Sequence, residues 1–281
     1  MTYKTILVHL DCSSRSNERL DLGFSLAASQ DAHLVGYFAL SATQIPGYVR
    51  AAAGPIIEET ERHLRKESAE SVEAAFRAAM ARNPGVKTEW RVSLGDALDP
   101  VRLSARCADL VVLGQRPPAE EDDSGLAPDF IPGLLLSAGR PLLIVPNAGR
   151  YPSVGKRALV AWNGGREAAR AVVDALPLLR HSESVQVVVF ESGKGGGDHG
   201  EVAGADISLY LARHGVKVTA AQQQRSAGVD IGAQILSRAA DLDADLLVMG
   251  GYGHSRWREF LMGGATRTVL ESMTLPVLMS H

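Results

Sequence analysis

Glycines near the end of the chain have the spacing of a phosphate-binding loop. Gly250 and Gly253 follow the apolar run Leu246 to Met249, which is typical of a buried strand, and the pair Gly263-Gly264 precedes a helical stretch that begins at Ala265. Without a Cβ, glycine lets the backbone turn sharply and approach a ligand closely. The first N–H groups of a helix have no partner inside the helix and lie at its positive end. This pattern predicts a site for an anionic group such as a phosphate.

Asn163 is a second candidate for ligand binding in the same half of the chain. It follows the apolar run Ala158 to Trp162, and its side-chain amide can both donate and accept, as recognition of a base or ribose requires. In a doubly wound sheet, ligands bind beyond the carboxyl ends of the strands where the strand order reverses, so Asn163 and Gly250 would share a crevice if their strands are neighbours. The alternative is an Asx turn that begins the next helix after Gly164-Gly165.

Basic residues accompany the glycines. His254, Arg256 and Arg258 lie between the two groups of glycines, and Arg267 lies one turn into the following helix. Together they would form a basic rim around a phosphate, although arginines on a solvated surface are the alternative interpretation. No carboxylate close in sequence could pair with His254, so we expect no catalytic acid or base there.

The elements that position these residues occur twice. Three apolar segments with shared Asp and Gly positions recur in the same order: 5–11 and 157–163, 108–114 and 244–250, and 141–145 and 276–280. Three matches in one order indicate a duplication. We expect two domains, residues 1–148 and 154–281, joined around Asn147 to Lys156, where Pro, Asn, Gly and Ser cluster.

Each half alternates short apolar runs with helical periodicity, which predicts an α/β fold. The predicted strands are 6–10, 34–38, 88–92, 110–113 and 142–145, then 158–162, 185–190, 216–220, 246–249 and 277–279. The predicted helices are 16–29, 58–82 and one opening at 99–100, then 166–179, 205–214, 229–240 and 265–273. Because most strands are apolar on both faces, we expect two doubly wound, open parallel sheets of Rossmann-like type.

Composition narrows the class of protein. With 281 residues, 46% of them hydrophobic, the chain can bury two cores. A net charge of −3 gives no general reason to bind nucleic acid or an anionic membrane, and no apolar stretch approaches the roughly 20 residues of a membrane helix. No secretory leader is evident, and Cys12 and Cys107 lack metal-ligand spacing. We expect a cytoplasmic protein that binds no metal of its own, no nucleic acid and no membrane.

The first half lacks the phosphate pattern. Pro117 stands where the second glycine of the loop would be, and four carboxylates follow at 120–123, where they would repel a polyphosphate. Asp11 keeps the polar position at the end of the first strand. We therefore expect one anion site per chain, in the second half.

These residues resemble the universal stress protein family, whose ATP-binding members carry GxxGx(9)G followed by Ser or Thr. Gly250, Gly253 and Gly263 match that spacing, and the preceding Ala244–Gly250 strengthens the resemblance. The whole chain resembles the tandem form of the family. The resemblance implies two five-stranded parallel sheets of order 3-2-1-4-5, and an adenine nucleotide such as ATP, with Mg²⁺, across the crevice.

The resemblance also implies a set of nucleotide-binding residues in the second half. They are Ala161, Asn163, Gly250, Gly253, Gly263, Gly264, Ala265 and Thr266. Two of them depart from the family pattern, because Gly264 replaces the Ser or Thr and Asn163 replaces an Asp that contacts the base. Loss of one hydroxyl costs on the order of 1 to 2 kcal/mol, so we expect ATP to bind about tenfold more weakly. The amides of residues 264–266 remain, and the Thr266 hydroxyl could contribute.

The leading functional hypothesis is a stress-response sensor or regulator that binds an adenine nucleotide. A nucleotide-free adaptor or small-ligand scaffold is the alternative, and slow ATP hydrolysis is a third interpretation, although no residue stands out as a base that activates water. We also expect the last strands of the two halves, 142–145 and 277–279, to pair, because an apolar edge strand needs to be covered. That pairing would make an intramolecular pseudo-dimer, which could dimerise again.

Overall fold

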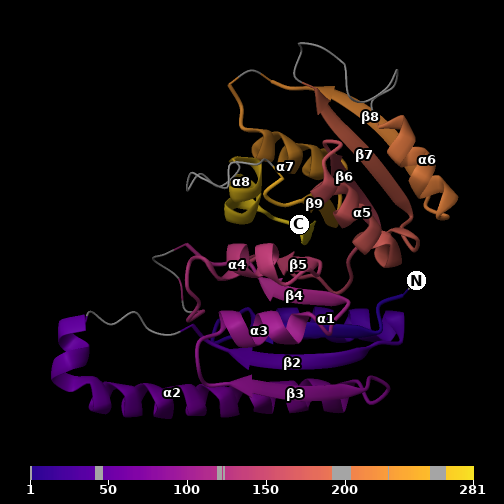
Figure 1. Cartoon of the computed structure of the whole chain (residues 1–281). Helices are drawn as coiled ribbons and strands as arrows, with labels where there is room; N and C mark the ends of the chain where they lie inside the picture. The colour runs from indigo at the N-terminus through magenta and orange to yellow at the C-terminus, as the bar shows by residue number, and fades with distance from the viewer. Residues whose placement is uncertain are drawn as a thin grey trace. The chain divides into compact units, whose positions relative to one another are not determined.

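The structure, a computed structural model, describes residues 2–41, 47–118, 122, 124–191, 204–226, 228–253 and 264–281. Within these residues the chain forms two compact units, Tyr3–Ala138 and Gly139–His281. Each unit is an α/β layer structure, and each is described separately below (Figure 1).

The N-terminal unit contains four parallel strands in the order β3-β2-β1-β4. The strands are β1 Thr5–Leu10, β2 His33–Ala39, β3 Thr88–Ser93 and β4 Leu110–Gly114. The helices are α1 Ser16–Gln30, α2 Gly47–Arg82, α3 Leu98–Ala105 and α4 Phe130–Ser137.

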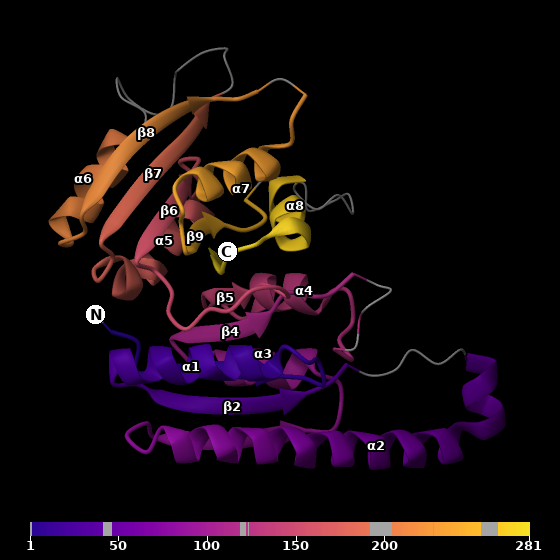
Figure 2. The ribbon, with the colours of Figure 1, turned by 180° about the vertical axis from the view of Figure 1, so that it is seen from behind.

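Helices cover both faces of this sheet (Figures 1 and 2). On one face, Phe24 of α1 and Phe76 of α2 are in contact, with ring centroids 5.9 Å apart. A Cβ at Gly36 of β2 would lie 2.5 Å from the Phe76 ring, so glycine is what allows α2 to pack this closely on the strand. The central strands β1 and β4 are buried almost throughout, as the apolar runs predicted.

The C-terminal unit contains six strands in the order β5-β10-β9-β6-β7-β8. The strands are β5 Leu142–Val145, β6 Arg157–Trp162, β7 Ser184–Glu191, β8 Val218–Gln224, β9 Leu246–Gly250 and β10 Val277–Ser280. The helices are α5 Arg166–Leu179, α6 Ala205–Arg213, α7 Ile231–Asp241 and α8 Gly264–Ser272. Strands β6 to β10 are parallel and have the predicted 3-2-1-4-5 order, and β5 pairs antiparallel with β10, as predicted for the last strands of the two halves.

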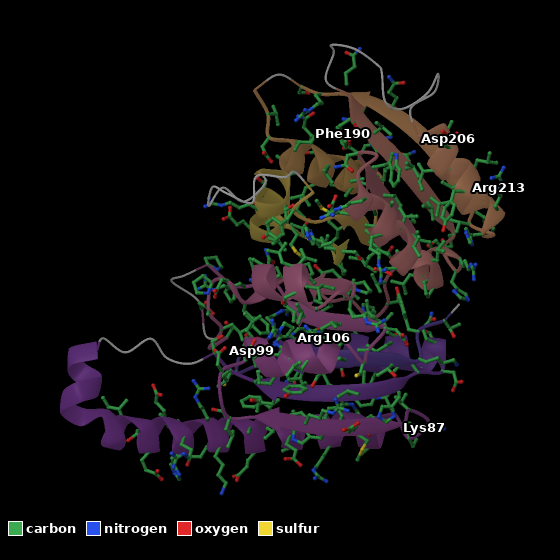
Figure 3. The ribbon with its side chains drawn as sticks, in the orientation of Figure 1. Lys87, Asp99, Arg106, Phe190, Asp206 and Arg213 are labelled. Atoms are coloured by element: carbon green, nitrogen blue, oxygen red, sulfur yellow. The ribbon has the colours of Figure 1, made fainter. Side chains whose placement is uncertain are left out.

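The charged residues at the ends of α6 complement the dipole of this helix. Asp206 lies in the first turn of α6 and Arg213 in the last, where each charge is opposite to that of the helix end. Figure 3 shows the two labelled side chains at opposite ends of the helix.

The repeated Ala-Asp pair has a structural role that is the same in both units. Asp109 accepts hydrogen bonds from the backbone N–H groups of Lys4 and Thr5, at 2.7 and 3.0 Å. Asp245 accepts from those of Lys156 and Arg157, at 3.0 and 2.8 Å. Each aspartate therefore ties the start of its strand to the start of the neighbouring strand, which explains why the sequence repeats it.

The fold differs from the sequence prediction mainly at two helices. Helix α2 begins at Gly47, well before the predicted start at residue 58, although the added segment contains Gly54 and Pro55. Helix α4 was not predicted, because Pro132 and Gly133 resemble a turn. Pro132 is tolerated in the first helical turn, and a Cβ at Gly133 would lie 3.1 Å from the Leu98 side chain, so glycine permits close packing of α4 on α3. No helix among the described residues has the length and apolar character needed to span a membrane.

Candidate functional site

The strand order of the C-terminal unit reverses between β6 and β9 (Figure 1). Ala161 of β6 lies opposite Met249 of β9, so Asn163 and Gly250 come together at the carboxyl ends of neighbouring strands. This is where open α/β sheets bind ligands. The structure thus brings the two predicted halves of the site together.

Gly250 is needed for contact between protein segments. A Cβ at this position would lie 2.5 Å from the backbone N of Ala168 and 2.8 Å from the Cβ of Glu167. The end of β9 therefore packs directly on the first turn of α5. The sequence analysis expected Gly250 to let a ligand approach. In the structure, the first turn of α5 occupies the space beside Gly250.

The amides of the bend after β9 are partly used. Gly251 N donates to the Ser280 carbonyl oxygen at 2.9 Å, and Tyr252 N donates to Oγ1 of Thr266 at 3.3 Å. Thr266 is buried, and accepting this bond still leaves its hydroxyl hydrogen free to donate. The bend and α8 are thus joined by one of the residues predicted to bind phosphate.

Tyr252 adopts a backbone conformation that aromatic residues seldom adopt. Its φ of 57° lies in the left-handed region, although a glycine stands on either side of it. Burial raises the pKa of its hydroxyl above 10.0. Backbone strain of this kind concentrates at functional sites, which supports a binding role for the bend.

Asn163 forms the Asx turn that was the alternative interpretation. Its Oδ1 accepts from the N–H of Gly165 at 2.9 Å, and Gly164 has a φ of 71°. The residue is exposed beyond the end of β6.

The start of α8 supplies the amides that were predicted to hold phosphate. Among the described residues, none accepts a hydrogen bond from the N–H groups of Gly264 and Ala265. Asp230 lies close by, because a Cβ at Gly264 would be 3.2 Å from its Oδ2, while its Oδ1 caps α7 by accepting from Gly232 N at 2.7 Å. An acidic side chain therefore stands beside the predicted anion site.

Several residues of the sequence prediction cannot be placed. Gly263 and the basic residues His254, Arg256 and Arg258 lie outside the described residues, as do Glu120, Glu121 and Asp123 of the acidic segment. Asp122 is described, and its carboxylate pairs with Arg116 Nε at 2.8 Å.

Sequence reasoning missed Glu167, the most buried charged group at this site. Its residue is 4% exposed, and its Oε1 pairs with Arg166 Nε. Its Oε2 lies between two loops, 2.7 Å from where a Cβ of Gly253 would be and 3.3 Å from where one of Gly165 would be. Burial opposes ionisation, but the Arg166 hydrogen bond and charge outweigh it and lower the pKa of the Glu167 carboxyl below 4.5. An acidic residue in a first helical turn directly after Asn-Gly-Gly was the available signal.

The equivalent crevice of the N-terminal unit is filled by a buried ion pair. Arg19 Nη1 donates to Oδ2 of Asp11 at 2.8 Å, and Ser13 and Ser16 also donate to this carboxylate. Asp11 is 1% exposed and Arg19 is 2% exposed. A Cβ at Gly114, the counterpart of Gly250, would collide with the Arg19 guanidinium. Burial would raise the pKa of Asp11, but the Arg19 charge and hydrogen bonds hold it well below its usual range.

His9 is buried next to this pair. Its Nε2 lies 2.9 Å from the Ala39 carbonyl oxygen, and its ring packs on Phe130 with centroids 4.9 Å apart. Burial lowers the pKa of His9 from 6.5 to about 4, with the nearby Asp11 opposing the shift and Arg19 adding to it. The ring is therefore neutral at physiological pH.

Comparison with known proteins agrees with this architecture. Residues 155–281 match the model of the universal stress protein family. The whole chain is similar in fold to a universal stress protein from Archaeoglobus fulgidus DSM 4304, with a TM-score of 0.66, 17% identity, and coverage of 98% of this chain and 97% of that one. It is also similar to a functionally unknown protein from Pseudomonas aeruginosa PAO1, with a TM-score of 0.58, 16% identity, and coverage of 99% and 92%. No curated protein matches the sequence.

The buried ion pair makes the N-terminal unit sensitive to loss of one charge. Asp11→Asn leaves the Arg19 guanidinium buried without its counter-charge, so we expect the free energy of unfolding to fall by about 3 to 5 kcal/mol. Urea denaturation monitored by circular dichroism measures this change.

Asp21→Asn is the matched control, because Asp21 lies on α1, the helix that carries Arg19, and pairs with Arg82 at 3.1 Å, but both side chains are about 60% exposed. We expect this variant to remain within about 1 kcal/mol of wild type. Equal effects of the two substitutions would show that the Asp11 pair is no more important than a surface pair.

His9 predicts a pH dependence of stability. Between pH 6.5 and about 4, the unfolded chain binds a proton at His9 that the folded chain does not, so stability is full above pH 6.5 and falls as the pH drops toward 4. The slope contributed by this one group approaches about 1.4 kcal/mol per pH unit. Urea denaturation of wild type and His9→Gln at pH 4.5, 5.5, 6.5 and 7.5 tests it. Parallel pH profiles for the two proteins would contradict the assignment.

Proposed function

We propose that residues 155–281, which match the model of the universal stress protein family, bind an adenine nucleotide such as ATP. The protein would act as a stress-response sensor or regulator in the cytoplasm. The observation that carries the proposal is the reversal of strand order between β6 and β9, with Gly250 and Gly253 at the end of β9 and Thr266 of α8 bonded to the N–H of Tyr252.

The proposed arrangement follows the crevice. The nucleoside lies near Ala161 and Asn163, and the phosphates lie between Gly253 and the start of α8, with Gly264, Ala265 and Thr266 as donors. Gly250 and Gly263 complete the proposed set, and Gly263 lies outside the described residues. Among the described residues, no group of three His, Cys, Asp or Glu could hold a metal ion. A Mg²⁺ ion would therefore be held chiefly by the phosphates.

The proposed domains are residues 1–148 and 154–281. We propose that the first of them has a structural role. The Asp11–Arg19 pair takes the place of a ligand there. The antiparallel pairing of β5 with β10 supports an intramolecular pseudo-dimer, which could form a homodimer in turn. The role we assign is regulatory, and slow ATP hydrolysis is the most that we would expect as catalysis.

A nucleotide-free adaptor is the second candidate function. One observation favours it, because the carboxylates of Glu167 and Asp230 stand beside the amides that a phosphate would need. Ligand binding separates the two functions.

Gly264→Asp tests nucleotide binding at the proposed position. The substitution adds a carboxylate at the start of α8, where a Cβ would be 3.2 Å from Asp230 Oδ2, to the carboxylates of Asp230 and Glu167. We therefore expect ATP affinity to fall at least about tenfold. Equilibrium dialysis with labelled ATP measures it.

Gly85→Asp is the control, because it adds the same charge in the N-terminal unit, at a position where a Cβ would have no neighbour within 4 Å. We expect it to bind ATP as wild type does. Absence of saturable binding by wild type would favour the adaptor, and equal binding by wild type and Gly264→Asp would place the nucleotide elsewhere.

A further inference from the structure

The carboxylate of Glu167 lies where a ligand phosphate would approach the bend after β9. We propose that Glu167 competes with ligand phosphates and makes the C-terminal site selective for adenine ligands that carry little phosphate charge. This inference rests on the proposed function and identifies the residue that decides its substrate class.

The position of the carboxylate is defined by two glycines. Oε2 of Glu167 is 2.7 Å from where a Cβ of Gly253 would be and 3.3 Å from where one of Gly165 would be. A phosphate oxygen that reached the Gly253 amide would have to come close to this oxygen. The absence of a side chain at Gly253, which the sequence analysis attributed to the approach of a ligand, and at Gly165 makes room for an acidic side chain of the protein.

The carboxylate is held in its charged form. It lies in the first turn of α5, whose N-terminal end favours a negative charge, and Arg166 pairs with Oε1. The Arg166 side chain is 82% exposed, whereas that of Glu167 is 5% exposed, so solvent screens the cation far more than the anion. The buried charge beside Gly253 is therefore negative, and the His281 ring lies at the same bend, with its Nδ1 3.0 Å from the Gly251 carbonyl oxygen.

A second carboxylate extends this effect to the other side of the predicted phosphate path. Asp230 Oδ2 lies beside Gly264 at the start of α8. A triphosphate between Gly253 and Gly264 would meet a negative side chain at each end, and repulsion between like charges is strongest where water is excluded. A neutral nucleoside contacting Asn163 would avoid both.

In the N-terminal unit, the side chain packed at the equivalent position is basic instead of acidic. There the counterpart of Gly250 is Gly114, and the group packed on it is the Arg19 guanidinium neutralised by Asp11. An acidic group at the C-terminal crevice is thus a particular property of that half, with a consequence for which ligand it accepts.

Calorimetric titrations of adenosine and ATP into wild type and Glu167→Gln, each with Mg²⁺ and with EDTA, test the inference. For wild type we expect ATP to bind no more tightly than adenosine. Glu167→Gln keeps the size of the side chain and removes its charge, so ATP affinity should rise at least about tenfold while adenosine affinity stays within about threefold. Glu271→Gln is the control, because it removes the same charge from an exposed i,i+4 pair with Arg267 on α8, and it should change neither affinity by more than about threefold.

The outcomes separate this inference from the proposed function. Wild type that binds ATP at least about tenfold more tightly than adenosine overturns the inference, and this arm does not depend on the folding of any variant. Equal ATP affinity in both proteins overturns the inference and leaves nucleotide binding standing. If Glu167→Gln binds ATP more weakly than wild type with Mg²⁺ but not with EDTA, Glu167 is a cation ligand, and this result also overturns the inference. If Glu167→Gln binds ATP and wild type does not, the inference is supported and ATP is not the native ligand. If neither protein binds adenosine or ATP, both proposals are rejected.

Discussion

Where the strand order of an open parallel sheet reverses, the helices on either side leave a hollow at the carboxyl ends of two strands, and polar groups must fill it or water must enter. This constraint applies twice in the chain, at β1 and β4 and again at β6 and β9. The N-terminal unit meets it with the buried pair of Arg19 and Asp11, which packs against Gly114. The C-terminal unit places Glu167 there, which is buried while its partner Arg166 is exposed, and His281 Nδ1 lies 3.0 Å from the Gly251 carbonyl oxygen at the same bend. The buried carboxylate thus has a buried counter-charge in one unit and an exposed one in the other.

The fold was predictable from the sequence because most of its strands are apolar on both faces and are bounded by repeated residues. Asp109 and Asp245 illustrate this, because each fixes the start of two neighbouring strands through backbone hydrogen bonds and therefore recurs at the same place in both halves. The prediction was incomplete where glycine and proline serve packing instead of a turn. Gly133 lets α4 approach α3, and Pro132 fits the first turn of the helix, so residues that commonly mark a loop here lie inside a helix.

The site was predictable only in part. The resemblance to the universal stress protein family implied the strand order 3-2-1-4-5, and with that order Asn163 and Gly250 fall at the carboxyl ends of neighbouring strands. It did not indicate what each glycine contacts. Gly250 packs on the backbone of α5, and Gly253 lies against the Glu167 carboxylate, since a missing Cβ makes room for protein as readily as for a ligand. Arg19 and Glu167 were missed for a related reason: an isolated charge on a helix is usually exposed, and only the packing of the helix on its sheet shows that it is buried.

The two halves of a duplicated chain have therefore diverged in charge at the same structural position, and this divergence is the central claim of our account. Native mass spectrometry of the full chain with an adenine ligand, titrated to saturation, tests it most directly. We predict one bound ligand per chain, because the buried Asp11 and Arg19 side chains fill the equivalent place in the N-terminal unit. Two ligands per chain would contradict the account, because a ligand would then have displaced the Arg19–Asp11 pair. No bound ligand at saturation would contradict the assignment of the C-terminal crevice as a ligand site.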